Sequence, residues 1–232
     1  TSLEPAFECP LCKDTGTVNG RMCQCVGRRA RQLRREEIAK ESPLYLCDFG
    51  SMELRYYPDE PDAATGVSIR EEMRETLAAL RDYAESFDMK STSLLLCGNA
   101  GLGKTHAALA IAQTVLEKGY DVVYISAQSL FGQLERDRFA DDCPLLEAVL
   151  EADLLVLDDL GTEYVSAYVL SCFYNLLNTR RLEKRPTVYP TNIVDGKAFE
   201  ARYTEKIASR LGGSCEPVLF VGQDIRKLKS ME

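Results

Sequence analysis

Short apolar runs alternate with helical patterns along most of the chain, and this alternation predicts an α/β fold. The runs of strand length lie at 94–97, 121–126, 154–157, 186–192 and 216–221. The helical patterns lie at 68–87, 107–112, 164–182 and 207–213. Strands separated by helices form a parallel sheet that helices cover on both faces. We therefore expect a five-stranded parallel sheet flanked by helices.

The fourth apolar run, which begins at Pro186, ends in the polar residue Asn192. A polar side chain at the end of a parallel strand can help to position a water molecule for attack. Pro190 lies within this run, and proline has no N–H to donate to a sheet ladder. We therefore expect the strand to end or kink at Pro190.

The part of the chain that precedes the sheet has a different pattern. Residues 27–40 are expected to form an arginine-rich helix, and a loop-rich stretch follows it. The arginines either face solvent on a linker helix or contact a nucleic-acid backbone or an acidic partner, and charge alone does not decide between these. The expected divisions are an N-terminal segment with the basic helix at 1–41, a linker at 42–67 and the sheet domain at 68–232.

Composition narrows the class of protein. The chain has 232 residues, 45% of them hydrophobic, which is enough for one sizeable core and a small appendage. No apolar stretch approaches the roughly 20 residues that span a bilayer, and the N-terminus resembles no signal peptide. Of nine cysteines, five are scattered singly like reduced thiols, so we expect a cytoplasmic protein that does not enter the membrane. The net charge of −8 argues against a surface coated with basic residues for duplex DNA. The chain begins with Thr1 instead of Met, which is consistent with a truncated fragment.

The remaining cysteines form two close pairs near the N-terminus. Cys9 and Cys12 make a CxxC pair, and Cys23 and Cys25 follow as CxC after ten residues. Four thiolates in this spacing suit a tetrahedral structural zinc site, and the turn signal at 19–20 predicts a short hairpin between the pairs. Two disulfides or redox thiols are the alternative. Because so short a segment has little apolar core of its own, we expect it to fold around zinc.

The strongest chemical signal lies in residues 98–105, which read GNAGLGKT, a complete GxxxxGKT phosphate loop between an expected strand and an expected helix. Glycines let backbone N–H groups close around phosphates, and the helix N-terminus adds the positive end of its dipole. Lys104 supplies a positive charge, and the Thr105 hydroxyl is placed to ligate Mg²⁺. The residues expected to bind the nucleotide are Gly98, Asn99, Ala100, Gly101, Leu102, Gly103, Lys104, Thr105, His106 and Asp158.

Two acids follow the third apolar run. An apolar strand that ends in Asp158 and Asp159 has the Walker B pattern. We expect Asp158 to hold Mg²⁺ and Asp159 to orient and polarise the attacking water. Asn192, at the end of the next strand, is expected to lie between these acids and the γ-phosphate. The pattern predicts binding and hydrolysis of a nucleoside triphosphate.

These motifs together resemble the DnaC/DnaI-type helicase loaders of the AAA+ superfamily over nearly the whole chain. The stretches that carry the resemblance are 9–16, 101–106, 158–163, 209–211 and 222–226. The resemblance implies the strand order 5-1-4-3-2 and ATP as the nucleotide. It also implies Asn192 as sensor 1, Arg210 as an arginine finger that reaches a neighbouring subunit, and Arg226 as a sensor-2-like residue.

The same resemblance implies the partners. It suggests a DNA replication protein that binds a DnaB-type replicative helicase and single-stranded DNA, assembles with itself through the ATP site and hydrolyses ATP slowly unless assembled. The N-terminal cysteine segment is expected to dock on the helicase. One alternative is an IstB-type transposition helper, whose relatives usually lack the cysteine segment. Another is a nucleotide-gated adaptor with little turnover. A small-molecule kinase has little use for the acids together with Asn192 and Arg210.

Overall fold

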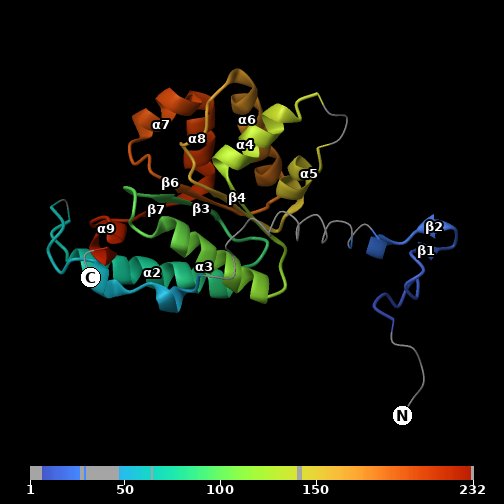
Figure 1. The fold of residues 1–232 in the computed structure, drawn as a ribbon, viewed down its shortest axis with the longest axis horizontal. Helices are drawn as coiled ribbons and strands as arrows, with labels where there is room; N and C mark the ends of the chain where they lie inside the picture. Colours follow the sequence, from blue (N-terminus) through green and yellow to red (C-terminus); the bar gives the residue numbers. More distant parts are fainter. Residues whose placement is uncertain (1–6, 27–28, 30–46, 64, 140–142, 231–232) are drawn as a thin grey trace, which may run out of the picture.

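The computed structural model describes residues 7–26, 29, 47–63, 65–139 and 143–230. The strands of its main sheet are β3 (Ser93–Cys97), β4 (Val122–Ser126), β5 (Leu154–Asp158), β6 (Thr187–Thr191) and β7 (Cys215–Leu219). They form a five-stranded sheet in the order β4-β5-β6-β3-β7, and each neighbouring pair is parallel (Figure 1). Counted along the chain from β3, this order is 5-1-4-3-2, which confirms the expected architecture.

Helices cover both faces of this sheet. They are α2 (Ile69–Ser86), α3 (Lys104–Glu117), α4 (Ala127–Arg136), α5 (Pro144–Glu151), α6 (Ala167–Leu182), α7 (Gly196–Tyr203), α8 (Glu205–Ser214) and α9 (Ile225–Lys229). Figure 1 shows α2 and α3 on one face and α4 to α8 on the other. Side chains alternate accordingly, since Leu154 and Val156 join the core under α2 and α3, while Leu155 and Leu157 join the core under α4 to α8. Among the helices that the structure describes, none has both the length and the apolarity that a bilayer crossing needs.

Local capping sets the helix boundaries. Ser68 caps α2, which therefore begins at Ile69, within one residue of the expected start. Ser166 caps α6, so this helix begins at Ala167 and not at Tyr164 as expected. Helices α4 and α5 were not anticipated between the second and third strands.

The expectation that Pro190 ends or kinks its strand was wrong. β6 continues through Pro190 to Thr191, and Pro190 stays in register with Leu96 of β3. Within one strand residue, the N–H and C=O groups point to the same side, and the Pro190 carbonyl accepts from the Leu160 N–H at 2.9 Å on the β5 side. The missing N–H therefore faces the end of β5, beyond the last paired residues of β5 and β6, Val156 and Val188, so the ladder with β3 stays intact.

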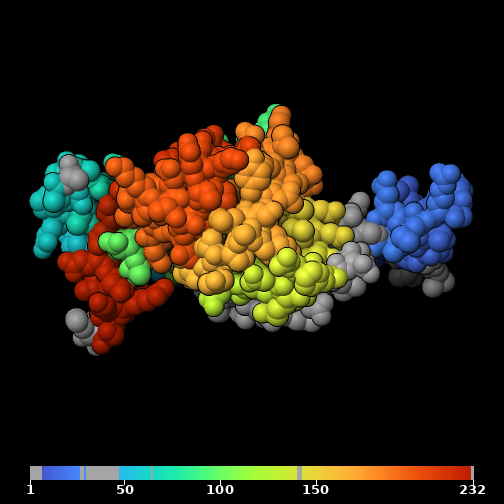
Figure 2. Space-filling model, turned by 90° about the horizontal axis from the view of Figure 1, so that it is seen from above, coloured from blue at the N-terminus to red at the C-terminus, as the bar shows by residue number. Residues whose placement is uncertain are grey.

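The N-terminal cysteine segment forms the expected hairpin. β1 (Thr17–Val18) and β2 (Arg21–Met22) pair antiparallel, and Asn19 between them has a positive φ of 51°. Figure 2 shows this segment (blue) set apart from the sheet domain. The basic helix expected at 27–40 lies almost wholly outside the described residues.

Candidate functional site

The phosphate loop joins β3 to α3, and the structure demands glycine in it. Gly98 has φ 155°, and a Cβ there would lie 2.6 Å from the carbonyl oxygen of Phe220. Gly101 has φ 80°, and a Cβ there would lie 1.9 Å from a carboxylate oxygen of Asp224. The loop is therefore packed against the chain that follows β7, and only glycine fits at either position.

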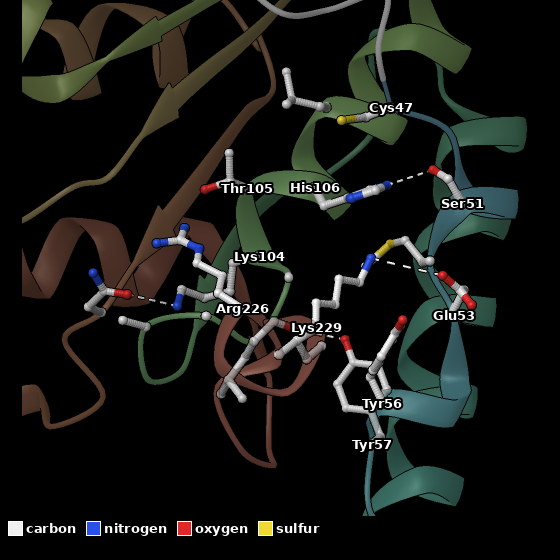
Figure 3. A pocket seen from close by; sticks show the side chains of 18 of the residues that line it. Cys47, Ser51, Glu53, Tyr56, Tyr57, Lys104, Thr105, His106, Arg226 and Lys229 are labelled. Atoms are coloured by element: carbon white, nitrogen blue, oxygen red, sulfur yellow. Dashed lines mark hydrogen bonds and ion pairs between the residues drawn. The ribbon is translucent and has the colours of Figure 1, made fainter. Parts of the chain in front are cut away.

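A cavity of about 470 Å³ opens beside this loop (Figure 3). Five parts of the chain form its walls, namely the phosphate loop with the start of α3, the segment that begins at Cys47, the loop after β5, the end of β6, and α9. Of the residues expected at the site, those lining it are Ala100, Gly101, Leu102, Gly103, Lys104, Thr105, His106, Asp159, Asn192 and Arg226. Its size suits a nucleotide, because ligand sites of small molecules occupy roughly 300 to 1,000 Å³.

The Lys104 ammonium lies at the centre of the loop. It donates to the carbonyls of Gly98 at 2.7 Å and Asn99 at 2.6 Å, and to Oδ1 of Asn192 at 2.8 Å. Burial lowers the pKa of Lys104, and the nearby charges of Asp159 and Asp158 act in the opposite direction. These contacts place a cation where the backbone and the end of β6 meet, as phosphate binding requires.

Asp158 lies beside Thr105 at the end of β5. The Thr105 hydroxyl donates to Oδ1 of Asp158 at 3.1 Å, and the Tyr124 hydroxyl donates to Oδ2 at 2.6 Å. Burial raises the pKa of Asp158, while the hydrogen bond from Tyr124 lowers it. A hydroxyl and a carboxylate brought together at a phosphate loop are the ligands that Mg²⁺ takes in such sites, so these residues fit the expected ion.

Tyr124 was missed by reasoning from the sequence. It lies on β4, where it is the one aromatic residue among aliphatic neighbours. β4 pairs with β5 so that Ser126 faces Asp158, which brings the Tyr124 ring alongside the acid. The sequence feature that could have indicated this role is a tyrosine, with its polar hydroxyl, between aliphatic residues near the end of a strand.

The remaining expected residues divide into two groups. Asp159, with φ 51°, Asn192 and Arg226 all line the cavity. Arg210 is not among the residues that line it. Its guanidinium donates to the Tyr174 hydroxyl at 2.6 Å and stacks 4.7 Å from that ring.

The segment before α2 closes the other side of the cavity, where the sequence predicted only a linker. It contains two short 3-10 turns, η2 (Phe49–Ser51) and η3 (Leu54–Tyr56). The Tyr57 hydroxyl donates to the Leu102 carbonyl at 2.8 Å, and burial raises the pKa of Tyr57 to about 12. His106 Nε2 lies 2.8 Å from the Ser51 hydroxyl, so His106 joins α3 to this segment.

The cavity mouth joins this segment to α9. Lys229 Nζ lies 3.9 Å from a Glu53 carboxylate oxygen and 4.8 Å from the Tyr56 ring centre. A dashed line marks the Lys229–Glu53 ion pair in Figure 3. The segment before α2 and the last helix of the sheet domain therefore meet over the site. The consecutive aromatics at 56–57 in a polar stretch were the sequence signal for this packing.

The four paired cysteines converge in the hairpin segment. Their sulfur atoms all lie within 4.8 Å of one another, with Cys9 and Cys23 3.8 Å apart and Cys12 and Cys25 3.3 Å apart. Zinc–sulfur bonds of about 2.3 Å in a tetrahedron place sulfurs about 3.8 Å apart, whereas a disulfide needs about 2.05 Å. Backbone hydrogen bonds from Cys12 and Leu11 lower the pKa of Cys9 to about 7. The donor set and its spacing fit a structural zinc ion.

Known proteins are similar to this chain in sequence. A family model described as IstB-like ATP binding protein matches residues 70–231. The replicative helicase loader DnaC of Escherichia coli strain K12 is 31% identical over 119 residues, which are 50% of this chain and 49% of that protein. The phage-like element PBSX protein XkdC of Bacillus subtilis strain 168 is 29% identical over 234 residues, covering 93% of this chain and 82% of that protein. The chain thus spans about half the length of DnaC.

Solved structures agree at the level of the fold. The crystal structure of the DnaC helicase loader superposes with a TM-score of 0.60 and 22% identity, covering 72% of this chain and 99% of that one. The structure of DnaI superposes with a TM-score of 0.61 and 20% identity, covering 79% of this chain and 92% of that one. The sheet domain accordingly has the AAA+ P-loop fold.

Proposed function

The chain belongs to the family of IstB-like ATP-binding proteins, and we propose that it is an ATP-dependent helicase loader. One observation carries this proposal. A nucleotide cavity, lined by Lys104, Asp159 and Asn192 and with Asp158 beside it, stands in a fold shared with DnaC and DnaI. A four-cysteine segment precedes that fold. The function that joins these parts is nucleotide-controlled delivery of a replicative helicase onto DNA.

The proposed reaction is ATP hydrolysis in this cavity. Thr105 and Asp158 would hold Mg²⁺, which neutralises charge on the phosphates, and Lys104 would turn from its loop carbonyls to the γ-phosphate. Asp159 would accept a hydrogen bond from the attacking water and orient it toward phosphorus, with Asn192 positioning the same water. Water adds to the γ-phosphorus as the bond to the ADP oxygen breaks, giving ADP and phosphate.

Arg210 supports hydrolysis that depends on assembly. It lies on α8, half-buried against Tyr174, and is not among the residues that line the cavity of its own chain. In the proposal, it reaches the γ-phosphate bound by a neighbouring copy, where an arginine finger is worth about 10³ to 10⁵ in rate. An isolated chain would then hydrolyse ATP slowly.

A second cavity supports binding of single-stranded DNA. It measures about 940 Å³ and lies between α4 and the loop after β5. Its lining includes the polar residues Ser129 and Gln133, the cation Arg136, the acids Glu135 and Glu163, and Tyr164, which is 81% exposed. An exposed aromatic residue and a cation that line one cavity offer the stacking and charge contacts that single strands use. Figure 2 looks onto the face of α4, α6, α7 and α8.

The cysteine segment supports docking on another protein. Leu11 is 73% exposed and Met22 is 76% exposed, although the segment is small. Exposed apolar side chains on a rigid, metal-held hairpin suit a protein partner. We propose that this partner is a DnaB-type replicative helicase.

Co-purification with the host's replicative helicase tests the proposal. We expect the wild-type chain with ATP to retain the helicase and to hydrolyse ATP faster when helicase and single-stranded DNA are present. Lys104→Ala should lose nucleotide binding, whereas Arg210→Ala should keep binding and lose the stimulated turnover. A chain that neither retains the helicase nor changes its deposition on single-stranded DNA would contradict the loader function.

A second candidate follows from the family model itself, whose description is IstB-like. A transposition helper would retain a transposase in the same co-purification and would act on duplex DNA. A nucleotide-gated adaptor would also retain its partner. Its rate of ATP hydrolysis would be unchanged by Asp159→Asn. The retained protein and the effect of Asp159→Asn therefore distinguish the three functions.

A further inference from the structure

Glu163 is a buried carboxylate that the proposed reaction does not use. It lies five residues beyond the end of β5 and is only 2% exposed. Its Oε2 accepts the Gly161 N–H at 3.0 Å, and its Oε1 accepts the hydroxyl of Tyr203 at the end of α7. The Arg202 guanidinium donates to the Glu163 carbonyl. An ionised carboxylate is rarely buried this fully unless its oxygens have partners, so both donors are needed to keep it there.

On one side, Glu163 belongs to the loop that carries Asp159. The Thr162 N–H donates to the Asp159 carbonyl at 3.1 Å, which makes residues 159–162 a tight turn. The Leu160 carbonyl accepts from the Thr191 hydroxyl at 2.6 Å. Thr191 directly precedes Asn192, so the loop from Asp159 to Glu163 is bonded to the strand end that presents Asn192. A shift of Asp159 or Asn192 on nucleotide binding therefore moves this loop.

On the other side, Tyr203 belongs to the helix pair that carries Arg210. Tyr203 is buried, and its ring packs 5.2 Å from the Phe173 centre and 4.6 Å from the Phe199 centre. One residue later, Thr204 turns the chain with φ 78° into α8, on which Arg210 lies. The Tyr203 hydroxyl is thus fixed at the junction from which α8 begins.

We propose that Glu163 is a positioning residue that couples the nucleotide state at Asp159 to the placement of Arg210 on α8. This inference rests on the proposed function, in which Arg210 serves a neighbouring copy. The physical reason is the burial of the carboxylate. If the Asp159 loop moves, either Tyr203 follows it or a buried charge loses a donor, and the second outcome is strongly unfavourable. The loop and α8 therefore change position together. Arg210 can then reach the neighbouring copy in only one nucleotide state of the chain to which it belongs.

Amide hydrogen exchange on the full chain tests this coupling. A non-hydrolysable ATP analogue and ADP are compared in the wild type, in Glu163→Gln and in the double variant Glu163→Met with Tyr203→Phe, which replaces both partners by apolar groups of similar size. Glu200→Gln, an exposed acid on the same helix α7, is the matched control. Exchange at 98–105 reports binding, and exchange at 205–214 reports α8.

We expect the analogue to change exchange in α8 relative to ADP in the wild type and in Glu200→Gln. In both Glu163 variants, this difference should fall about tenfold while the response at 98–105 is retained. An α8 response equal to that of the wild type in the double variant overturns the coupling, and so does an α8 that fails to respond in the wild type while 98–105 responds. Failure of the proposed function is distinct, because it appears as undiminished stimulated turnover in Arg210→Ala.

Discussion

At the residue scale, the environment of Asp158 determines how the nucleotide site is organised. Thr105, from the start of α3, and Tyr124, from β4, each donate a hydroxyl to a different oxygen of this carboxylate. Since Thr105 is itself an expected metal ligand, Tyr124 is the donor that stays with Asp158 when the ion binds. A fixed partner of this kind orients a ligand and raises the affinity of the site for metal.

Tyr124→Phe should therefore weaken Mg²⁺ binding without weakening nucleotide binding itself. Mg²⁺ is expected to increase the affinity for the nucleotide. We expect the Mg²⁺ concentration that gives half of this increase to rise by about tenfold or more in the variant. A fluorescent ATP analogue titrated at several Mg²⁺ concentrations measures this. Tyr83→Phe is the control, because Tyr83 donates to the Thr92 carbonyl at 2.8 Å away from the site. An unchanged Mg²⁺ dependence in Tyr124→Phe would show that Thr105 alone orients the acid.

At the element scale, one buried arginine joins the end of α5 to α6 and to the start of β6. Arg180 of α6 donates to carbonyls at the end of α5, those of Val149 and Ala152, and to the Pro186 carbonyl and Thr187 hydroxyl at the start of β6. Burial lowers the pKa of Arg180 to about 10. Each of its three nitrogens has an acceptor, which lets this guanidinium remain inside, and it in turn donates to carbonyls at the end of α5 and supplements the Leu155 N–H at the Pro186 carbonyl.

Arg180→Met should destabilise the sheet domain strongly. The substitution keeps apolar volume but leaves several buried carbonyls without a donor, each at a cost of about 1 to 3 kcal/mol. We expect the free energy of unfolding to fall by roughly 3 kcal/mol, measured by urea denaturation with unchanged slope. Arg181→Met, at the exposed neighbouring position, should change it by less than about 0.5 kcal/mol. Equal stabilities of the two variants would contradict the structural role.

At the scale of the whole molecule, the sheet domain and the cysteine segment 7–26 are each stabilised by different interactions. The sheet domain has two apolar cores, one on each face of the sheet. In the segment 7–26, the buried side chains are those of Cys12 and Cys23. A hairpin with no further buried residues does not supply the hydrophobic free energy that offsets the loss of chain entropy, so we expect a bound metal ion to supply the rest.

Removal of metal should therefore unfold one unit and spare the other. We expect one zinc ion per chain, lost on treatment with a strong chelator, together with rapid amide exchange and proteolysis in 7–26. Affinity for the ATP analogue should stay within about twofold, because the cavity is built from the sheet domain. Cys12→Ser should reproduce the loss of zinc, whereas Cys143→Ser, outside the cluster, should not. Full zinc content in Cys12→Ser would contradict the four-cysteine site.

The sequence by itself determined the features that depend on neighbouring residues. The phosphate loop, the acids at 158–159, the two cysteine pairs and the alternation of strands and helices are local patterns, because each needs a fixed spacing of residue types along the chain. The strand order followed from resemblance to a known family and was confirmed by the sheet. The roles assigned to Asn192, Arg210 and Arg226 stay predictions.

Only the tertiary structure decided which distant residues complete the site. Tyr124 reaches Asp158 because β4 and β5 are neighbours in register, and Pro190 is tolerated because its missing N–H faces the end of β5. Tyr57 closes the cavity, and Glu163 joins α7 to the loop that carries Asp159, through contacts between residues far apart in the sequence. Such contacts depend on how whole elements pack against one another, so the spacing of residues along the chain does not predict them.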